Sequence, residues 1–298
     1  MSRTGRIVRV VAITIAAVLA LSALAIWVLS ERRLTQRYDA SGADFVIPTD
    51  SASIARGEHL TRIATCTLCH GADLGGGIYA DMGPMGVIAG SNLTTGRGGV
   101  GSYYTASDWS RAIRRGVRQD STSLIVMPSE VFTHLSAEDL GAIVGYLRAR
   151  PPVDREVPRS HFGPLGRALL AMGKLNILVA PKTEDYKYAA SVEPNESAEY
   201  GRYLADITGC HGCHGYGLSG GQVAGPPGLP PASNLTPTGI GAWSEADFVR
   251  AMREGKRPDG SILDEFMPWK NYTHMTDSEL RALWLYLREV PPKAFGRK

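Results

Sequence analysis

The pattern of apolar and charged positions separates an uncharged N-terminal run from a long region of shorter amphipathic segments. From Val10 to Leu29 the chain carries no charged side chain. Because a helix rises about 1.5 Å per residue, a run of this length spans the roughly 30 Å hydrocarbon core of a bilayer. We therefore expect a transmembrane anchor within residues 1–32, with residues 10–29 in contact with lipid.

Positive charge precedes this run, at Arg3, Arg6 and Arg9. Basic residues favour the cytoplasmic side of a membrane, so the short N-terminus is expected there and everything after Glu31 on the outer side. The predicted location is the inner (cytoplasmic) membrane of a bacterium, with a single pass and a periplasmic remainder. A cleaved signal peptide ending at Ala23-Leu24-Ala25 is the alternative. The anchor is favoured because apolar sequence continues through Ile26–Leu29, and either interpretation exports the rest of the chain.

The exported region contains an internal repeat, which shows in three pairs of segments. "RGEHLTRIATCTLCHGADLGGG" from Arg56 parallels "YGRYLADITGCHGCHGYGLSGG" from Tyr200. "YTASDWSRAIRRGVR" from Tyr104 parallels "WSEADFVRAMREGKR" from Trp243, and "VMPSEVFTHLSAEDLGAIVGYLRARPP" parallels "FMPWKNYTHMTDSELRALWLYLREVPP". The repeat predicts two domains of one fold, residues 50–152 and 197–298. Residues 33–49 would link the first domain to the anchor, and residues 153–196 would join the domains.

Each repeat reads as a few helices separated by loops rich in glycine and proline. Thr105–Asp108 and Ser244–Asp247 have the form of capping boxes, and apolar residues follow them at helical spacing. Ser136–Asp139 and Thr276–Glu279 open a final helix that should end before Pro151 or Pro291. Strand signals are weak, so the fold class is mainly α. Few strong hydrophobes lie between the helices, so we expect a large apolar group at the centre of each domain.

The joining segment matches neither repeat. Its stretch Phe162–Pro181 is apolar and potentially helical, but glycine and lysine interrupt it too often for a second membrane span. We expect a strap packed across the two domains. A membrane-surface or partner-docking helix is the alternative.

The charge distribution excludes one class of partner. The net charge is +3, but six arginines within the first 40 residues account for the excess, and basic and acidic side chains nearly balance in the remainder. No basic stripe of the kind that binds nucleic acid is present, so nucleic acid is not expected as a partner.

All four cysteines lie in two Cys-x-x-Cys-His motifs, which are attachment signatures for c-type haem. On a helix, positions i, i+3 and i+4 share one side, so both thiols can bond one porphyrin edge while the imidazole turns toward the iron. We expect two covalently bound c-type haems. Their attachment and proximal residues would be Cys66, Cys69 and His70 in the first repeat and Cys210, Cys213 and His214 in the second.

Other uses of these cysteines fit less well. A structural zinc site needs four ligands, and pooling the two pairs would break the duplication. A redox dithiol normally accompanies a βαβ unit, for which the sequence has no signal. A disulfide across two intervening residues suits such redox sites more than structural staples.

Each iron needs a sixth ligand or an open position, and the duplication nominates it. Met127 in "VMPSE" and Met267 in "FMPWK" are the methionines that align between the repeats after the haem motif. His134 and His274 also recur and are the competing candidates. Met82, Met85, Met252 and Met275 do not recur and are interpreted as core or loop residues. A His/Met pair leaves no vacancy and raises the reduction potential, which is typical of an electron carrier.

Six further residues are candidates for contacts with the haem propionates. Candidates for binding the propionates, with packing as an equal alternative, are Tyr104, Trp243, Arg114, Arg253, Asn92 and Asn234. His59 aligns with Tyr203 and His211 with Thr67, so neither histidine has a recurring role. Both are interpreted as surface or packing residues.

With these motifs in place, the sequence resembles class I cytochrome c domains, from the Cys-x-x-Cys-His motif through Met-Pro to the closing "LRALWLYLREVPP". Over residues 50–292 it is similar to the first two domains of the cytochrome c subunits of membrane-bound periplasmic alcohol, aldehyde and gluconate dehydrogenases. The resemblance implies two tandem class I cytochrome c domains that pass electrons from a dehydrogenase toward the quinone pool or an oxidase. No third haem motif is present and the anchor is N-terminal, whereas those subunits usually have three haems and a C-terminal attachment.

Three functions follow from these features. The leading one is a membrane-anchored dihaem electron carrier, which is not itself an enzyme. Its redox partners would be a dehydrogenase, a quinol-oxidising complex, an oxidase or a reaction centre. A dihaem peroxidase is the enzyme alternative, and it would require an iron that opens a coordination position. A haem-based sensor is disfavoured because no signalling domain accompanies the motifs.

Overall fold

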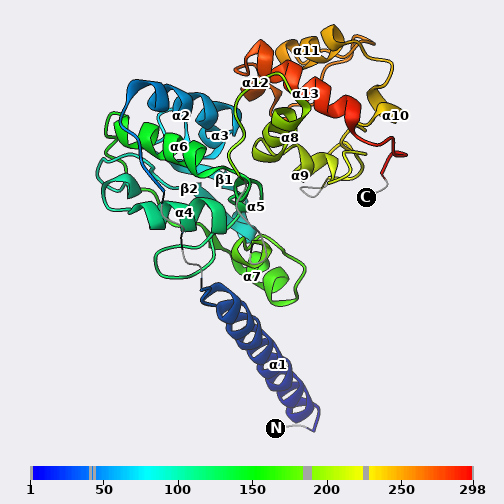
Figure 1. Ribbon diagram of the computed structural model, residues 1–298. Coiled ribbons are helices and arrows are strands. Elements are labelled where there is room, and N and C mark those ends of the chain that lie inside the picture. The colour runs from blue at the N-terminus through cyan, green and yellow to red at the C-terminus, as the bar shows by residue number, and fades with distance from the viewer. Residues whose placement is uncertain (1–2, 40–41, 43–44, 184–189, 224–227, 297–298) are drawn as a thin grey trace.

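The computed structural model describes residues 3–39, 42, 45–183, 190–223 and 228–296, and it is mainly helical (Figure 1). Helix α1 (Arg3–Leu34) projects from a body with two lobes that lie side by side. We call residues 45–183 the N-terminal lobe and residues 190–296 the C-terminal lobe. The expected fold class, mainly α with an apolar N-terminal helix, is confirmed at this level.

Five helices of one lobe have an equivalent in the other, in the same order. The N-terminal lobe contains α2 (Ser51–Ile63), α3 (Cys66–His70), α4 (Ala106–Arg115), α5 (Ser129–Phe132), α6 (Ala137–Ala149) and α7 (Pro164–Ala171). The C-terminal lobe contains α8 (Ala198–Ile207), α9 (Cys210–His214), α10 (Pro237–Ile240), α11 (Glu245–Glu254), α12 (Trp269–Tyr272) and α13 (Asp277–Glu289). The equivalent pairs are α2 and α8, α3 and α9, α4 and α11, α5 and α12, and α6 and α13. Short 3-10 turns are η1 (Gly83–Met85), η2 (Val100–Ser102) and η3 (Ala180–Lys182).

The capping residues begin the helices where the sequence predicts. Thr105 and Ser244 each form a complete capping box with the aspartate three residues later, and Thr276 forms one with Glu279. Ser136 accepts a hydrogen bond from the Asp139 amide. Helices α6 and α13 end at Ala149 and Glu289, two residues before a proline.

The first and last long helices of each lobe cross at a glycine. A Cβ on Gly57 of α2 would lie 1.9 Å from the Ala142 carbonyl oxygen of α6, and one on Gly201 of α8 would lie 2.0 Å from the Ala282 oxygen of α13. A side chain at either position would push the helices apart. The first and last long helices therefore pack against each other in the same close manner in both lobes.

A small antiparallel sheet departs from the sequence prediction. Strands β1 (Gly77–Asp81), β2 (Gly86–Gly90) and β3 (His161–Phe162) pair in the order β1-β2-β3. The strands are short and glycine begins two of them, so they carry little period-two alternation to detect. At Gly86, a Cβ would lie 2.1 Å from the His161 carbonyl oxygen, so the third strand requires glycine there.

Up to Thr183 the segment that joins the repeats packs against the N-terminal lobe, whereas near its end Glu196 pairs with Arg281 of α13 at 3.0 Å. Strand β3 pairs with β2, and α7 contacts both η1 and α1. Further along, the Val126 amide donates to the Ile177 carbonyl at 3.0 Å, and Ile125 forms an isolated bridge with Leu178. Residues 184–189 of the segment lie outside the described residues.

The lobes meet through equivalent helices, with unlike side chains at equivalent positions. His59 Nε2 of α2 lies 2.8 Å from Glu279 Oε2 of α13, and the Tyr203 hydroxyl of α8 donates to Asp139 Oδ2 of α6 at 2.7 Å. In the repeat, His59 corresponds to Tyr203 and Glu279 to Asp139. The interface is therefore pseudo-twofold, and His59, expected to be an ordinary surface or packing residue, binds across it.

Candidate haem sites

Each Cys-x-x-Cys-His motif forms one short helix that begins after a left-handed residue. Thr65 (φ 60°) precedes α3 and Gly209 (φ 81°) precedes α9. Each turn brings the chain abruptly from the preceding long helix into the motif. The expected placement of the two cysteines and the histidine on one short helix holds in both lobes.

The two histidines are held in the same way. His70 Nδ1 lies 2.7 Å from the Ser91 carbonyl oxygen, and His214 Nδ1 lies 2.7 Å from the Ser233 oxygen. A carbonyl only accepts, so Nδ1 carries the proton and the Nε2 lone pair remains available to a metal. Burial lowers the pKa of both histidines, more than the carbonyl bond raises it, which favours the neutral form that ligates iron.

The cysteines are free thiols in a desolvated setting. All four are half-buried, and none of them forms a disulfide in the described structure. Burial raises the pKa of Cys66 to about 12 and that of Cys210 to about 11. Catalytic redox cysteines have lowered pKa values and react as thiolates, whereas these thiols have raised pKa values and stay protonated at neutral pH. Within the described ranges, no three His, Cys, Asp or Glu side chains are grouped as a metal site requires.

Each motif opens onto a largely apolar cavity. The cavity of the N-terminal lobe has a volume of about 310 Å³ and that of the C-terminal lobe about 360 Å³, which is the scale of cofactor sites. The first is lined by Cys66, Cys69, His70, Met127, Trp109, Ile113, Phe132 and Leu147 among others. The second is lined by Cys210, Cys213, His214, Met267, Phe248, Met252, Tyr272 and Leu287 among others.

Comparison with known proteins agrees with this geometry. The family model for cytochrome c matches residues 198–291. The C-terminal lobe is a cytochrome c domain. Domains of this family bind c-type haem covalently and serve electron transport.

The chain is also similar to cytochrome subunits of dehydrogenases. It is 32% identical over 267 residues to the fructose dehydrogenase cytochrome subunit of Gluconobacter japonicus, which covers 81% of this chain and 53% of that protein. It is 29% identical over 293 residues to the cytochrome c subunit of the quinone alcohol dehydrogenase of Gluconobacter oxydans (86% and 58%). It is 28% identical over 281 residues to the gluconate 2-dehydrogenase cytochrome c subunit of Pantoea cypripedii (82% and 61%). The chain thus spans between half and two thirds of the length of these relatives.

Of the two candidate types for the sixth ligand, the methionines line the cavities and the recurring histidines His134 and His274 do not. Met127 and Met267 line their cavities, and each is followed by a proline and a short helix. His134 and His274 follow those short helices and do not line either cavity. His274 is exposed. Each thioether is therefore in the same cavity as the histidine of its lobe.

Arg114 and Arg253, the arginines that are candidates for propionate binding or for packing, bind the backbone. Arg114 Nη2 donates to the Leu135 carbonyl at 2.6 Å, and Arg253 Nη1 donates to the Thr273 carbonyl. Neither side chain lines a cavity. Each arginine ties α4 or α11 to the loop before the last helix, which is a structural role.

Asn92 and Asn234, the asparagines that are candidates for propionate binding or for packing, also bind the backbone. Asn92 Nδ2 donates to the Val153 carbonyl at 2.7 Å, and Asn234 Nδ2 donates to the Lys293 carbonyl at 2.8 Å. Their Oδ1 atoms accept from the backbone amides two residues later. These amides fasten the cavity loop to the segment that follows the last helix. Tyr104 and Asn92 do line the N-terminal cavity, whereas Trp243 and Asn234 do not line the C-terminal one.

Sequence reasoning missed a second pair of arginines, Arg118 and Arg257, which do line the cavities. Arg118 Nη1 donates to the Ser123 carbonyl, and Arg257 Nη1 donates to the Ile262 carbonyl at 3.1 Å. In the described part of the chain, neither guanidinium is within 4.0 Å of a carboxylate. Burial lowers the pKa of Arg118, a penalty that a nearby anion would relieve. Both arginines recur in the repeat, so the criterion that nominated the methionines could have found them.

These features fit a c-type haem in each lobe. The proximal histidine has a free Nε2, the thiols are uncharged, and a thioether shares the cavity. Each wall is largely apolar, and it includes one recurring cation, Arg118 or Arg257, that has no carboxylate within 4.0 Å among the described residues. A porphyrin with two propionates has the matching chemistry.

Proposed function

We propose that the chain is a membrane-anchored dihaem cytochrome c that carries electrons from a dehydrogenase toward a downstream acceptor. In this proposal the N-terminal lobe is a second cytochrome c domain, with domains at residues 50–152 and 197–298. Residues 33–49 link the first domain to the anchor in residues 1–32, and residues 153–196 are the interdomain strap. The observation that carries the proposal is the double occurrence of one constellation: Cys-x-x-Cys-His, methionine and arginine around an apolar cavity.

The residues of each lobe have defined roles in holding the cofactor. Cys66 and Cys69 would form the thioether bonds in the first domain, with His70 and Met127 as axial ligands. Cys210, Cys213, His214 and Met267 would do the same in the second. A haem held between imidazole and thioether supplies a one-electron couple of raised potential without an open coordination position. The Ser91 and Ser233 carbonyls keep each imidazole oriented.

A sulfur ligand has a direct spectroscopic signature. The oxidised protein should show a near-infrared absorption band from sulfur-to-iron charge transfer. Met127→Ala and Met267→Ala should each remove part of the band, and the double variant should remove it entirely. Met275→Ala, a buried methionine of the same lobe that does not line the cavity, is the control and should keep the band. A band that persists in the double variant would show that the axial assignment is wrong.

A dehydrogenase is the partner that the relatives support, because they are named as cytochrome subunits of fructose, alcohol and gluconate dehydrogenases. Gentle purification of the protein from its native membranes should therefore retain a dehydrogenase. That enzyme's substrate should then reduce the haems. Recovery of a quinol-oxidising complex or an oxidase with no dehydrogenase would instead favour a tethered shuttle between respiratory complexes.

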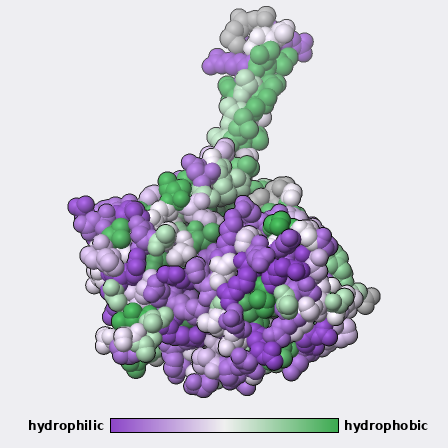
Figure 2. Space-filling view, turned by 90° about the horizontal axis from the view of Figure 1, so that it is seen from above, coloured by the Kyte–Doolittle hydropathy of each residue, from purple (hydrophilic) through white to green (hydrophobic). Residues whose placement is uncertain are grey.

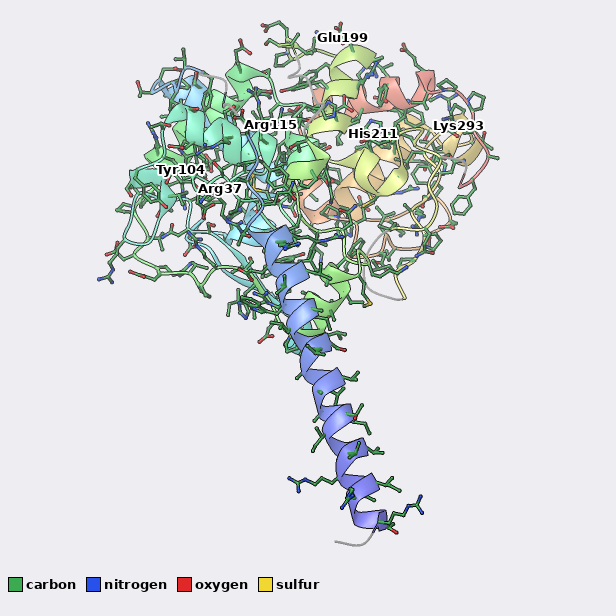
Figure 3. All side chains as sticks on the ribbon, turned by 90° about the horizontal axis from the view of Figure 1, so that it is seen from below. Arg37, Tyr104, Arg115, Glu199, His211 and Lys293 are labelled. Atoms are coloured by element: carbon green, nitrogen blue, oxygen red, sulfur yellow. The ribbon has the colours of Figure 1, made fainter. Side chains whose placement is uncertain are left out.

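The anchor and its orientation belong to the same proposal. Helix α1 is long and apolar enough to cross a membrane, and most of its length projects from the body, with exposed side chains over residues 3–25 (Figure 3). Arg3, Arg6 and Arg9 at its start support a cytoplasmic N-terminus and a periplasmic body on an inner membrane.

A dihaem peroxidase has less support. It needs an iron that can bind peroxide, whereas a methionine that could occupy the sixth position lines each cavity. The named relatives are cytochrome subunits of dehydrogenases. Peroxide turnover by the purified protein should therefore not exceed that of free haem.

A further inference from the structure

Helix α7 has an apolar side that the protein leaves uncovered. Its inward side carries Gly166 and Leu170, and Leu170 is 1% exposed. On the other side, Leu165 is 49% exposed and Met172, just after the helix, is 61% exposed, with Leu169 between them. The spacing i, i+4, i+7 places these three side chains in one row. We call Leu165, Leu169 and Met172 the α7 stripe.

Helix α7 is fixed to the last turns of α1. Arg167 Nη1 lies 3.1 Å from Ser30 Oγ and 2.8 Å from Glu31 Oε2. Leu34 of α1 packs against the cluster that contains Phe162 and Leu170. Ser30 is completely buried, whereas the side chains of residues 3–25 of α1 are exposed. The position of α7 along α1 is thus set at residues 30–34, where the two helices meet in Figure 1.

This position coincides with the end of the apolar run. The run stops at Leu29, and at about 1.5 Å per residue Ser30 lies at the edge of the segment that fits the hydrocarbon core. Ile26 and Val28, inside the run, are half-buried, so the folded body reaches the level of its last turn. Trp27 is 54% exposed, and tryptophan is enriched at the membrane–water boundary. Whatever packs beside Ser30 therefore lies at headgroup depth.

Basic side chains accompany the α7 stripe. Arg32 and Arg33 follow the apolar run on α1, and Lys174 follows the stripe; all three are exposed. Arg33 is next to the turn after α7, since a Cβ at Gly173 would lie 3.6 Å from its Nη2. Figure 2 shows the apolar surface of α1 leading to a largely hydrophilic body. An apolar row flanked by cations at this depth is the arrangement of an interfacial helix on anionic lipid.

We propose that the α7 stripe is a second membrane contact, inserted into the boundary between headgroups and acyl chains. Arg33 and Lys174 would lie at the level of the lipid phosphates. This inference rests on α1 being the membrane span, as proposed above. Its consequence is a fixed orientation: two contacts prevent the body from swinging about α1. The segment after α7 also bonds to Val126, the neighbour of Met127, so the N-terminal cavity becomes the one held close to the membrane.

Site-directed spin labelling of the full-length mature protein tests the proposal. Thioether formation would consume the native cysteines, so an introduced cysteine alone takes the nitroxide. Leu165→Cys and Met172→Cys report on the stripe, Val18→Cys on the middle of α1, and Val46→Cys, 83% exposed, on solvent. Each labelled protein is placed in phosphatidylethanolamine and phosphatidylglycerol vesicles. Collision rates with oxygen and with a water-soluble nickel chelate give the depth.

Both stripe labels should collide more with oxygen and less with nickel than the Val46→Cys label. Their depth should be about 5–10 Å, shallower than the label at position 18. Stripe labels as open to nickel as the Val46→Cys label, with the position 18 label in lipid, would overturn the α7 contact and leave the anchor intact. Labels shielded from both reagents would show that protein covers the stripe and would also overturn it. A water-exposed label at position 18 would refute the membrane span and this inference together.

Discussion

At the residue scale, each lobe places one arginine of the repeat, Arg118 or Arg257, at the wall of its cavity. Arg118 and Arg257 follow α4 and α11 at equivalent positions, and each one holds an equivalent carbonyl, that of Ser123 or Ile262. These contacts hold an equivalent guanidinium at the wall of each cavity. A fixed cation near a haem disfavours the oxidised state, which carries one more positive charge.

Replacing either arginine by glutamine should lower the potential of the haem in its own lobe. A unit charge about 10 Å away contributes about 1.7 kcal/mol at an effective dielectric constant of about 20. About 59 mV corresponds to 1.4 kcal/mol for one electron, so the shift should be tens of millivolts after screening. In a spectroelectrochemical titration, Arg118→Gln and Arg257→Gln should each lower the reduction potential of one haem and leave that of the other haem unchanged. Arg202→Gln, an exposed control on α8, should move neither. Equal shifts of both couples would contradict the assignment.

Residue types alone did not separate the two pairs of arginines. Arg114 and Arg118 both recur in the second repeat, and both lie close to the cavity in sequence. The α4 helix ends at Arg115, so Arg114 turns toward the Leu135 loop while Arg118 is carried beyond the helix to the cavity wall. Which arginine reaches the cavity wall depends on where the helix ends. That boundary is set by Gly116 in the left-handed region (φ 62°), which ends α4.

At the scale of elements, the helix ends were predictable because local chemistry sets them. A capping serine or threonine bonds within its own turn, and proline forbids the next turn, so neither needs tertiary information. The three-stranded sheet was missed for the opposite reason. Its strand β3 comes from the segment joining the repeats and pairs with β2 at Gly86↔Phe162, far away in sequence.

The helix crossings give a prediction at this scale. Gly57→Ala and Gly201→Ala each place a Cβ within 2.0 Å of a backbone oxygen, which no side-chain rotation relieves. Overpacking of this kind lowers the free energy of unfolding by about 1–3 kcal/mol. Because a backbone oxygen cannot move aside as a side chain can, we expect a loss of about 3 kcal/mol or more for these variants. Guanidinium unfolding of the haem-loaded protein measures the loss.

Arg202→Ala on the same helix as Gly201 is the matched control, because it adds no atom at the crossing. It should stay within about 0.5 kcal/mol of the parent. A glycine variant as stable as this control would mean that the helices do not approach each other as closely as described.

At the scale of the whole molecule, the lobes are joined by a charged network on a pseudo-twofold axis. Glu279, 4% exposed, accepts from His59 of the other lobe and lies 3.6 Å from Arg56 Nη1. Arg56 also pairs with Asp139 at 3.0 Å. The two lobes lie on either side of this network, and Figure 3 labels Tyr104 in the N-terminal lobe and His211 in the C-terminal lobe.

The network makes the stability of the protein depend on pH. Burial alone would raise the pKa of Glu279, but the hydrogen bond and charge of His59, the Thr276 amide and Arg56 together hold it below its usual value. A lowered pKa stabilises the fold above the unfolded value of about 4.3, and the contribution is lost as the pH falls through the folded value. Glu279→Gln should therefore cost about 1.5–3 kcal/mol near neutral pH, and this cost should shrink in acid.

Chemical unfolding of the parent and Glu279→Gln proteins across this pH range measures the difference. Glu245→Gln, which removes an exposed pair with Arg281, serves as the control and should cost less than about 1 kcal/mol. A difference for Glu279→Gln that stays constant down to acid pH would show that its charge does not stabilise the interface.

The interface also shows where comparison of the repeats reaches its limit. Recurrence nominates Met127 and Met267 because both lobes place methionine at the equivalent point of the cavity wall. His59 and Tyr203 are equivalent but unlike, so recurrence assigned them no shared function. Both nevertheless donate to an equivalent carboxylate of the opposite lobe. Only the packing of one lobe on the other reveals that equivalence.

The central claim is that each lobe binds one haem covalently through its Cys-x-x-Cys-His motif. Haem content per chain, measured from the pyridine haemochrome spectrum of the purified mature protein and checked by intact mass, tests it most directly. We predict two c-type haems per chain, with one remaining when Cys66 and Cys69 are both replaced by alanine. One haem or none in the parent protein would contradict the claim.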